Sequence, residues 1–99
     1  MVVEARQTDE FRMWLHRLHD GKAAARIAAR IRRLEWGNPG DVKSLGSGLL
    51  EMRIDYGPGY RVYYVRRGAM IVVLLCGGDK RTQQRDIRQA QALAAELED

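Results

Sequence analysis

Cysteine, proline and long apolar runs are scarce in this chain of 99 residues. Cys76 is its single cysteine, which excludes a fold stapled by disulfides within the chain. The longest apolar run, Ala69–Cys76, is far shorter than the ~20 residues that span a bilayer, so we expect no membrane-spanning helix. No basic stretch followed by an apolar one opens the sequence, and we therefore expect no secretory leader and a cytoplasmic location.

What is present is the composition of an ordinary globular domain, with 45% apolar and 30% charged residues. A chain of this length predicts a single domain over residues 1–99. Basic residues outnumber acidic residues by 17 to 13, fourteen of the basic residues are arginines, and the excess is concentrated between Lys43 and Arg85. Clustered arginine favours a polyanionic partner such as nucleic acid, because the guanidinium matches phosphate geometry. The alternative is charge that only keeps the protein in solution.

Two amphipathic helices are predicted in the first half of the chain. Thr8 is a candidate N-cap, and apolar residues then recur at helical spacing as far as Leu18. Asp20-Gly21 separates this helix from a second one, which ends near Gly37. A short edge strand is predicted ahead of both helices, over Val2–Ala5.

The second half of the chain has the period-two pattern of strands. The predicted elements are strands over residues 50–56 and 60–66 joined by Gly57-Pro58-Gly59, an apolar strand over 70–76, and a helix over 82–96. We therefore expect an α+β domain, in which two N-terminal helices pack on a mainly antiparallel sheet of three or four strands and a C-terminal helix follows.

The first two of these strands are predicted to form a charged face. If Tyr56 lies opposite Tyr60, the register pairs Asp55 with Arg61. Fixed cations on rigid strands suit a phosphodiester site, and Tyr63 could stack on an RNA base. In the alternative, Asp55 and Arg61 form an exposed pair on a solvated face. The face carries Glu51, Arg53, Asp55, Arg61 and Tyr63.

The segment from Gly77 to Arg81 is a second candidate site. Glycines allow a backbone to approach phosphate closely, and Lys80 and Arg81 supply two cations just before a helix. The spacing is not that of a Walker A loop. An ordinary turn between strand and helix is the alternative, and Asp79 would oppose an anion there unless it orients Lys80.

Several other residues have both a structural and a functional interpretation. An arginine stripe on the second helix is either a solvated face or a contact for a polyanion; it consists of Arg26, Arg30 and Arg33. His16 and His19 lack the neighbouring ligands that a metal site needs, and Cys76 is expected to be a buried, unreactive thiol. We predict neither a metal nor a cofactor.

Five stretches, in this order, cover nearly the whole chain: Arg30–Arg33, Gly37–Lys43, Leu50–Ile54, Gly57–Tyr64 and Gly77–Ile87. Together they resemble the RelE/ParE superfamily of type II toxins, most closely the HigB-like branch of addiction module killer proteins. The resemblance implies a fold like that of microbial ribonucleases. It also implies an endoribonuclease that inhibits translation by cutting mRNA in the ribosomal A site.

Roles for individual residues follow from the same resemblance. RelE-type members cleave without a metal, by attack of the ribose 2′-hydroxyl on the adjacent phosphorus. Arg61, in the family's G-Y-R motif, would stabilise the transition state, and Arg53 falls where RelE places a lysine. Lys80 and Arg81 match a basic pair after the glycine-bearing strand, with Lys80 expected to be catalytic and Arg81 to bind RNA. Lys43 is expected to hold RNA.

The chain departs from RelE at two positions. Ile87 stands where RelE carries a tyrosine that is proposed as a base, and Glu51 stands where RelE carries a second lysine. Glu51 is therefore a candidate replacement base, or else an anchor for Arg53.

The resemblance further implies an antitoxin, which would be a helix-turn-helix protein encoded beside this chain. Operator DNA would be bound only through the complex with the antitoxin. An acidic segment of the antitoxin is expected to mask the basic site or to bridge two subunits. The other expected partner is mRNA on the ribosome, and no membrane is expected. Two alternatives remain open: a ParE-like inhibitor of DNA gyrase that is not a nuclease, and an inactive nucleic-acid-binding relative.

Overall fold

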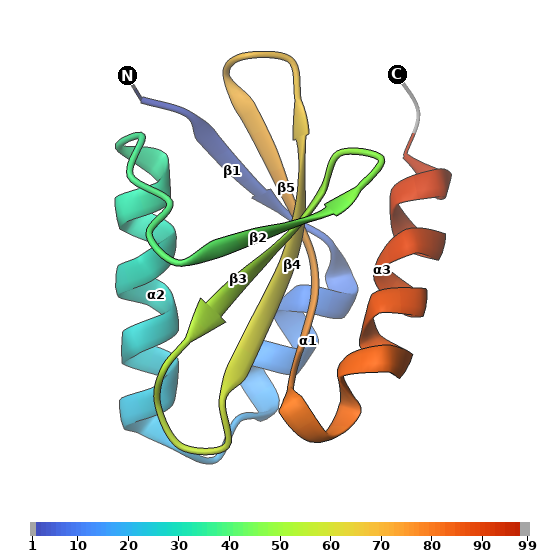
Figure 1. The fold of residues 1–99 in the computed structure, drawn as a ribbon. Helices are drawn as coiled ribbons and strands as arrows, with labels where there is room; N and C mark the ends of the chain where they lie inside the picture. Colours follow the sequence, from blue (N-terminus) through green and yellow to red (C-terminus); the bar gives the residue numbers. More distant parts are fainter. Residues whose placement is uncertain (1, 98–99) are drawn as a thin grey trace.

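A five-stranded sheet lies between helices on both of its faces in the computed structural model, which describes residues 2–97 (Figure 1). The strands lie in the order β1-β5-β4-β3-β2; β1 is parallel to β5 and the other neighbours are antiparallel. The α+β prediction is confirmed, with more strands than expected. The elements are β1 (Glu4–Gln7), α1 (Asp9–Arg17), α2 (Gly21–Glu35), β2 (Val42–Gly46), β3 (Leu49–Ile54), β4 (Tyr60–Arg67), β5 (Ile71–Asp79), the 3₁₀ helix η1 (Lys80–Thr82) and α3 (Gln83–Glu96).

The helices begin and end close to the residues that the sequence predicts, although Gly21, expected in the break, is the first residue of α2 and Thr82, expected in the last helix, belongs to η1. The Thr8 hydroxyl accepts a backbone N–H of the first turn of α1 at 3.0 Å, and Asp20 caps α2 in the same way. After α2, Gly37 has a φ of 88°, which lets the Asn38 N–H donate to the Arg33 carbonyl at 2.8 Å. Within residues 2–97, none of the helices has the length and apolar character needed to cross a bilayer.

Each face of the sheet packs against its own helices. On the face of α1 and α2 the core includes Phe11, Ile27, Ile31, Leu34, Met52, Ile54, Val62, Tyr64, Val72 and Leu74. On the face of α3 it includes Leu49, Tyr63, Val65, Leu75, Cys76 and Ala90. Alternating residues of β3 and β4 therefore point to opposite cores, as their period-two pattern predicts.

One strand was not predicted. β2 is an edge strand that pairs with β3, and Lys43 within it lies opposite Glu51. Its sequence is short and runs into a tight turn at Ser47, which has a φ of 52°. Because β2 has a neighbour on one side only and is largely exposed, it lacks a strong apolar pattern. β1 is the other edge strand, as predicted, although it begins later than expected.

The pairing of β3 with β4 differs by two residues from the predicted register. Ile54, rather than Tyr56, lies opposite Tyr60. Asp55 lies in the connecting loop and does not pair with Arg61, which corrects the prediction. The loop is longer than expected, since β3 ends at Ile54, and a turn closes it in which the Tyr56 carbonyl accepts the Gly59 N–H at 3.1 Å. Since the shift is an even number of residues, each side chain still points to its predicted face.

β5 continues through Gly77 and Gly78 to Asp79, beyond its predicted end. A Cβ on Gly77 would lie 2.4 Å from ring atoms of Trp14, and one on Gly78 would lie 1.8 Å from a carboxylate oxygen of Asp86. The two glycines thus allow α1 and α3 to approach the strand from opposite faces. The prediction that they form a turn able to cradle phosphate is therefore wrong.

We expect Gly77→Ala to reduce the free energy of unfolding by about 1–3 kcal/mol, the usual effect of forcing an extra methyl group into a packed core. Trp14 would have to move, because its ring occupies the space of the new Cβ. Urea unfolding measures the change. Gly21→Ala is the matched control, since no atom lies within 4 Å of its added Cβ. Equal stability of the two variants would contradict the close packing of Trp14 on Gly77.

Candidate functional site

A pocket of about 260 Å³ lies where the loop between β3 and β4 meets the end of β5. Three of the predicted catalytic residues, Arg53, Arg61 and Lys80, line it together. They come from β3, β4 and η1, and so converge from separate parts of the chain. The rest of the lining is Asp41, Ile54, Asp55, Gly57 and Gly59.

Arg61 is held in place by the backbone before any ligand arrives. Its side chain is 10% exposed, and its Nη1 donates to the carbonyls of Gly59 and Tyr60, each at 3.1 Å. Its Nε lies 4.0 Å from the Glu51 carboxylate and makes no hydrogen bond. Its Nη2 donates to none of the residues that the structure describes. One edge of a rigid guanidinium is therefore unused at the pocket.

The carboxylate of Glu51 is buried behind these arginines and is shared by several donors. It accepts hydrogen bonds from Arg53 Nε at 3.1 Å, the Tyr63 hydroxyl at 3.1 Å and the Gln83 amide at 2.7 Å. Burial opposes its ionisation, but these hydrogen bonds and the charge of Arg53 outweigh burial and hold the pKa of Glu51 below its ordinary value of 4.5. Arg53 and Arg61 lie directly opposite each other on neighbouring strands, so this charge offsets their mutual repulsion.

Burial rules out two of the predicted roles. Glu51 has no exposed surface and does not line the pocket, so it is not placed to take a proton from a substrate hydroxyl. Its contacts fit the alternative that it anchors Arg53. Tyr63 is also fully buried, so its ring is not available to stack on an RNA base. Burial and the Glu51 carboxylate raise the pKa of the Tyr63 phenol well above its ordinary value, which keeps it a hydrogen-bond donor.

Lys80 is positioned by the loop between β3 and β4. Its backbone N–H donates to the Gly59 carbonyl at 3.1 Å, and that carbonyl also accepts from Arg61. Gly59 has a φ of 83°, and a Cβ there would lie 2.9 Å from Lys80 Cε. The Lys80 side chain therefore crosses directly over Gly59 along the pocket wall, and one carbonyl connects both cations.

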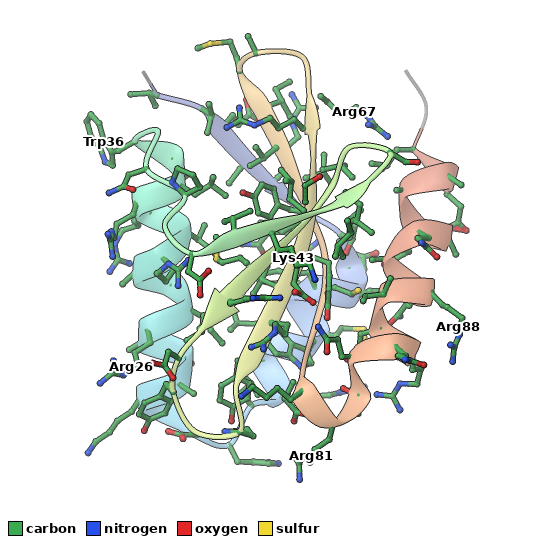
Figure 2. All side chains as sticks on the ribbon, viewed as in Figure 1. Arg26, Trp36, Lys43, Arg67, Arg81 and Arg88 are labelled. Atoms are coloured by element: carbon green, nitrogen blue, oxygen red, sulfur yellow. The ribbon has the colours of Figure 1, made fainter. Side chains whose placement is uncertain are left out.

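The other two predicted RNA-binding cations lie outside the pocket. Arg81 is exposed and forms a bidentate ion pair with Asp79, with N–O distances of 3.3 and 2.9 Å. This contact lowers the pKa of Asp79, which thus pairs with Arg81 and does not orient Lys80. Lys43 is exposed on β2, on the face that also carries Arg53 (Figure 2).

The arginine stripe of α2 is partly structural. Arg30 donates to the carbonyls of Arg53 at 2.6 Å and of Pro39 at 3.0 Å, and burial lowers its pKa. Arg26 lies over the ring of Tyr56, 4.6 Å from its centroid. Both residues hold the loops that flank the pocket, and the functional alternative is not needed to explain them.

Three contributors to the site were not predicted as site residues. Gln83 lies in the first turn of α3 and reaches Glu51, a contact between residues far apart in the sequence. Asp41 and Asp55 are exposed carboxylates in the pocket lining. Asp41 follows a turn cluster and Asp55 ends a strand pattern, and neither position distinguishes a site residue from an ordinary loop residue.

The remaining reactive residues lie elsewhere. His16 and His19 are exposed, and within residues 2–97 no three His, Cys, Asp or Glu side chains gather as a metal site would require. Cys76 is buried, as predicted, and burial raises the pKa of its thiol to about 12.

Comparison with known proteins places the chain in a family. Residues 13–97 match the family described as phage derived protein Gp49-like (DUF891). The chain belongs to the Gp49-like family. An uncharacterized protein of Haemophilus influenzae (strain ATCC 51907 / DSM 11121 / KW20 / Rd) is 50% identical over 97 residues, which is 98% of each chain.

The family match covers every residue of the pocket in this Gp49-like protein, as well as Glu51, Tyr63 and Gln83 behind it. It leaves out only β1 and the start of α1, which lie ahead of residue 13. The site is thus built entirely from the part of the chain that matches the family.

The lowered pKa of Glu51 predicts a loss of stability in acid. A carboxylate whose pKa falls on folding stabilises the folded state above its unfolded value of 4.5, and this contribution is lost as pH falls through the folded value. We therefore expect the stability difference between wild type and Glu51→Gln to be largest at neutral pH and to shrink below pH 4.5. Urea unfolding at several pH values tests this, with the exposed Glu96→Gln as control. A difference that does not depend on pH would contradict it.

Proposed function

We propose that this Gp49-like protein is the toxin of a toxin–antitoxin pair and acts in the cytoplasm as an endoribonuclease on ribosome-bound mRNA. The observation that carries the proposal is the convergence of Arg53, Arg61 and Lys80 on one pocket. The sequence resemblance to RelE/ParE toxins and membership of a phage-derived family support it. The partner would be an antitoxin encoded beside this chain, a helix-turn-helix protein through which operator DNA is bound.

The proposed reaction is an internal transesterification of RNA. The 2′-oxygen of one ribose forms a bond to the adjacent phosphorus, the bond from phosphorus to the 5′-oxygen breaks, and the products carry a 2′,3′-cyclic phosphate and a 5′-hydroxyl. The 2′-hydroxyl gives up its proton and the leaving 5′-oxygen gains one. Negative charge grows on the non-bridging oxygens in the transition state, so donors fixed around the phosphorus lower the barrier.

Arg61 and Lys80 suit that role because the Gly59 carbonyl accepts from the Arg61 guanidinium and from the Lys80 backbone N–H, which positions both residues at the pocket before substrate binds. The unused Nη2 of Arg61 can donate to a non-bridging oxygen without first breaking a bond to the protein. Arg53, whose side chain is 35% exposed, supplies a further cation beside them. Lys43, on the neighbouring edge strand, would hold the RNA backbone outside the pocket.

The group that takes the 2′-hydroxyl proton is an exposed carboxylate in this proposal. Glu51 is buried, whereas Asp41 and Asp55 line the pocket and are exposed. A carboxylate in the pocket lining is within reach of a bound substrate and is the kind of group that acts as a general base.

We expect Arg61→Ala and Lys80→Ala each to slow mRNA cleavage about 100-fold or more, since each removes a donor aimed at developing charge. Both variants should also stop arresting growth when expressed without the antitoxin. Primer extension on mRNA in a ribosome-containing translation reaction measures cleavage. Arg88→Ala is the matched control, because it removes an exposed arginine of α3 outside the pocket (Figure 2).

Wild-type activity in both variants would show that the pocket is not the site. Intact mRNA together with inhibited DNA supercoiling would instead favour the gyrase inhibitor. Normal growth on expression of the wild-type chain alone would favour the inactive relative.

We expect either Asp41→Asn or Asp55→Asn to reduce the single-turnover cleavage rate by about 100-fold or more while ribosome binding is kept, because the amide cannot accept the proton. Full activity in both variants would exclude a carboxylate base in this pocket.

A further inference from the structure

Exposed apolar side chains gather at the end of the molecule opposite the pocket. Among the described residues, four large apolar side chains are exposed, and three of them lie here: Trp36 is 73% exposed, Met70 53% and Val2 52%. Figure 2 shows Trp36 beside the upper end of α2, whereas Arg81 of η1, next to the pocket residue Lys80, lies at the bottom of the molecule. We refer to Val2, Trp36 and Met70 as the end patch.

Backbone hydrogen bonds bring the three segments of the end patch together. The Val3 N–H donates to the Glu35 carbonyl at 2.7 Å, which ties the residue after Val2 to the residue before Trp36. The Glu4 N–H donates to the Met70 carbonyl at 2.7 Å. The patch is therefore formed by three separate parts of the chain, and an exposed apolar patch with polar residues around it is typical of an interaction site.

The rim of the end patch carries three exposed arginines against two glutamates, of which Glu4 is paired with Arg6 and Glu35 is half-buried. Arg32 and Arg33 are exposed and lie one turn before Trp36 on α2, where residues three and four apart are neighbours. Arg66 is exposed on the face of β4 that packs toward α2, close to the turn that carries Met70. None of the three arginines forms an ion pair within residues 2–97. An apolar centre with unpaired cations around it is complementary to an acidic segment that carries an apolar anchor.

We propose that the end patch binds an acidic amphipathic segment of a partner protein, with an apolar side chain against Trp36 and carboxylates on the surrounding arginines. This inference rests on the proposed function, under which the partner is the antitoxin. Two of the three apolar side chains, Val2 and Met70, are aliphatic and give a base nothing to stack on, which favours protein over RNA. Tryptophan and arginine are also the side chains that contribute most to protein interfaces.

The position of the end patch leaves the pocket open. β4 runs from Tyr60 beside the pocket to Arg67 beside the patch, and a strand of this length spans roughly 25 Å. A segment bound at the patch does not touch Arg61 or Lys80. The partner therefore docks away from the catalytic cations, unlike the masking segment that the sequence suggested.

The test measures binding of the product of the adjacent reading frame by calorimetry, with Arg61→Ala as the background that permits expression. Trp36→Ala and Met70→Glu should each weaken binding about 30-fold or more, the usual effect of losing a central interface residue. Met13→Glu is the matched control for Met70→Glu, since Met13 is 49% exposed on α1, and should change the affinity less than about 2-fold. Arg33→Glu should weaken binding about 10-fold more than Arg88→Glu.

Each other outcome overturns the proposal. Equal affinities of Met70→Glu and Met13→Glu, or absence of binding, would exclude the end patch. Weaker binding on Lys80→Ala with normal binding on Trp36→Ala would place the partner at the pocket. A loss of ribosome binding in the patch variants, with antitoxin binding intact, would assign the patch to RNA.

Failure of the nuclease proposal is distinguishable from failure of this one. Patch-dependent binding, together with intact mRNA in the translation reaction with the wild-type chain, would retain the patch and reject the nuclease. Cleavage of mRNA without patch-dependent binding would do the reverse.

Discussion

The buried carboxylate of Glu51 is the contact on which the site depends. It accepts hydrogen bonds from β3, β4 and α3 at once, through Arg53, Tyr63 and Gln83. It also supplies the negative charge that lets two guanidinium groups lie directly opposite each other on neighbouring strands. A buried charge without such donors would be strongly unfavourable. The charged carboxylate is therefore stable only in a fold that brings β3, β4 and α3 together around it.

Two of the pocket cations likewise share one acceptor. One carbonyl, that of Gly59, accepts from both Arg61 and the backbone of Lys80, and only a residue able to adopt a φ of 83° with no Cβ fits beneath the lysine. Arg30, on the other side of the sheet, fixes the end of β3 through the Arg53 carbonyl. Backbone groups thus hold the guanidinium of Arg61 and the main chain of Lys80 in place.

Charge on this molecule is divided between two ends. The pocket lies at the end of the sheet where the loop between β3 and β4 meets η1, and the exposed Trp36 lies at the other end (Figure 2). Arginine serves different purposes at these ends: Arg61 is buried and directed by carbonyls, whereas Arg32 and Arg33 are exposed and form no ion pair with the residues that the structure describes. The basic composition therefore does not describe a single surface.

The sequence by itself determined the helices, their caps, and the face to which each residue of β3 and β4 points, because these follow from local spacing and capping chemistry. It also indicated Arg53, Arg61 and Lys80 as site residues. Only the tertiary structure decided the register of β3 and β4, the edge strand β2, and the burial of Glu51 and Tyr63. These features depend on how α3 covers the sheet and on how the loop after Ile54 closes. Both involve contacts between residues far apart in the chain, and such contacts produce no periodic pattern in the sequence.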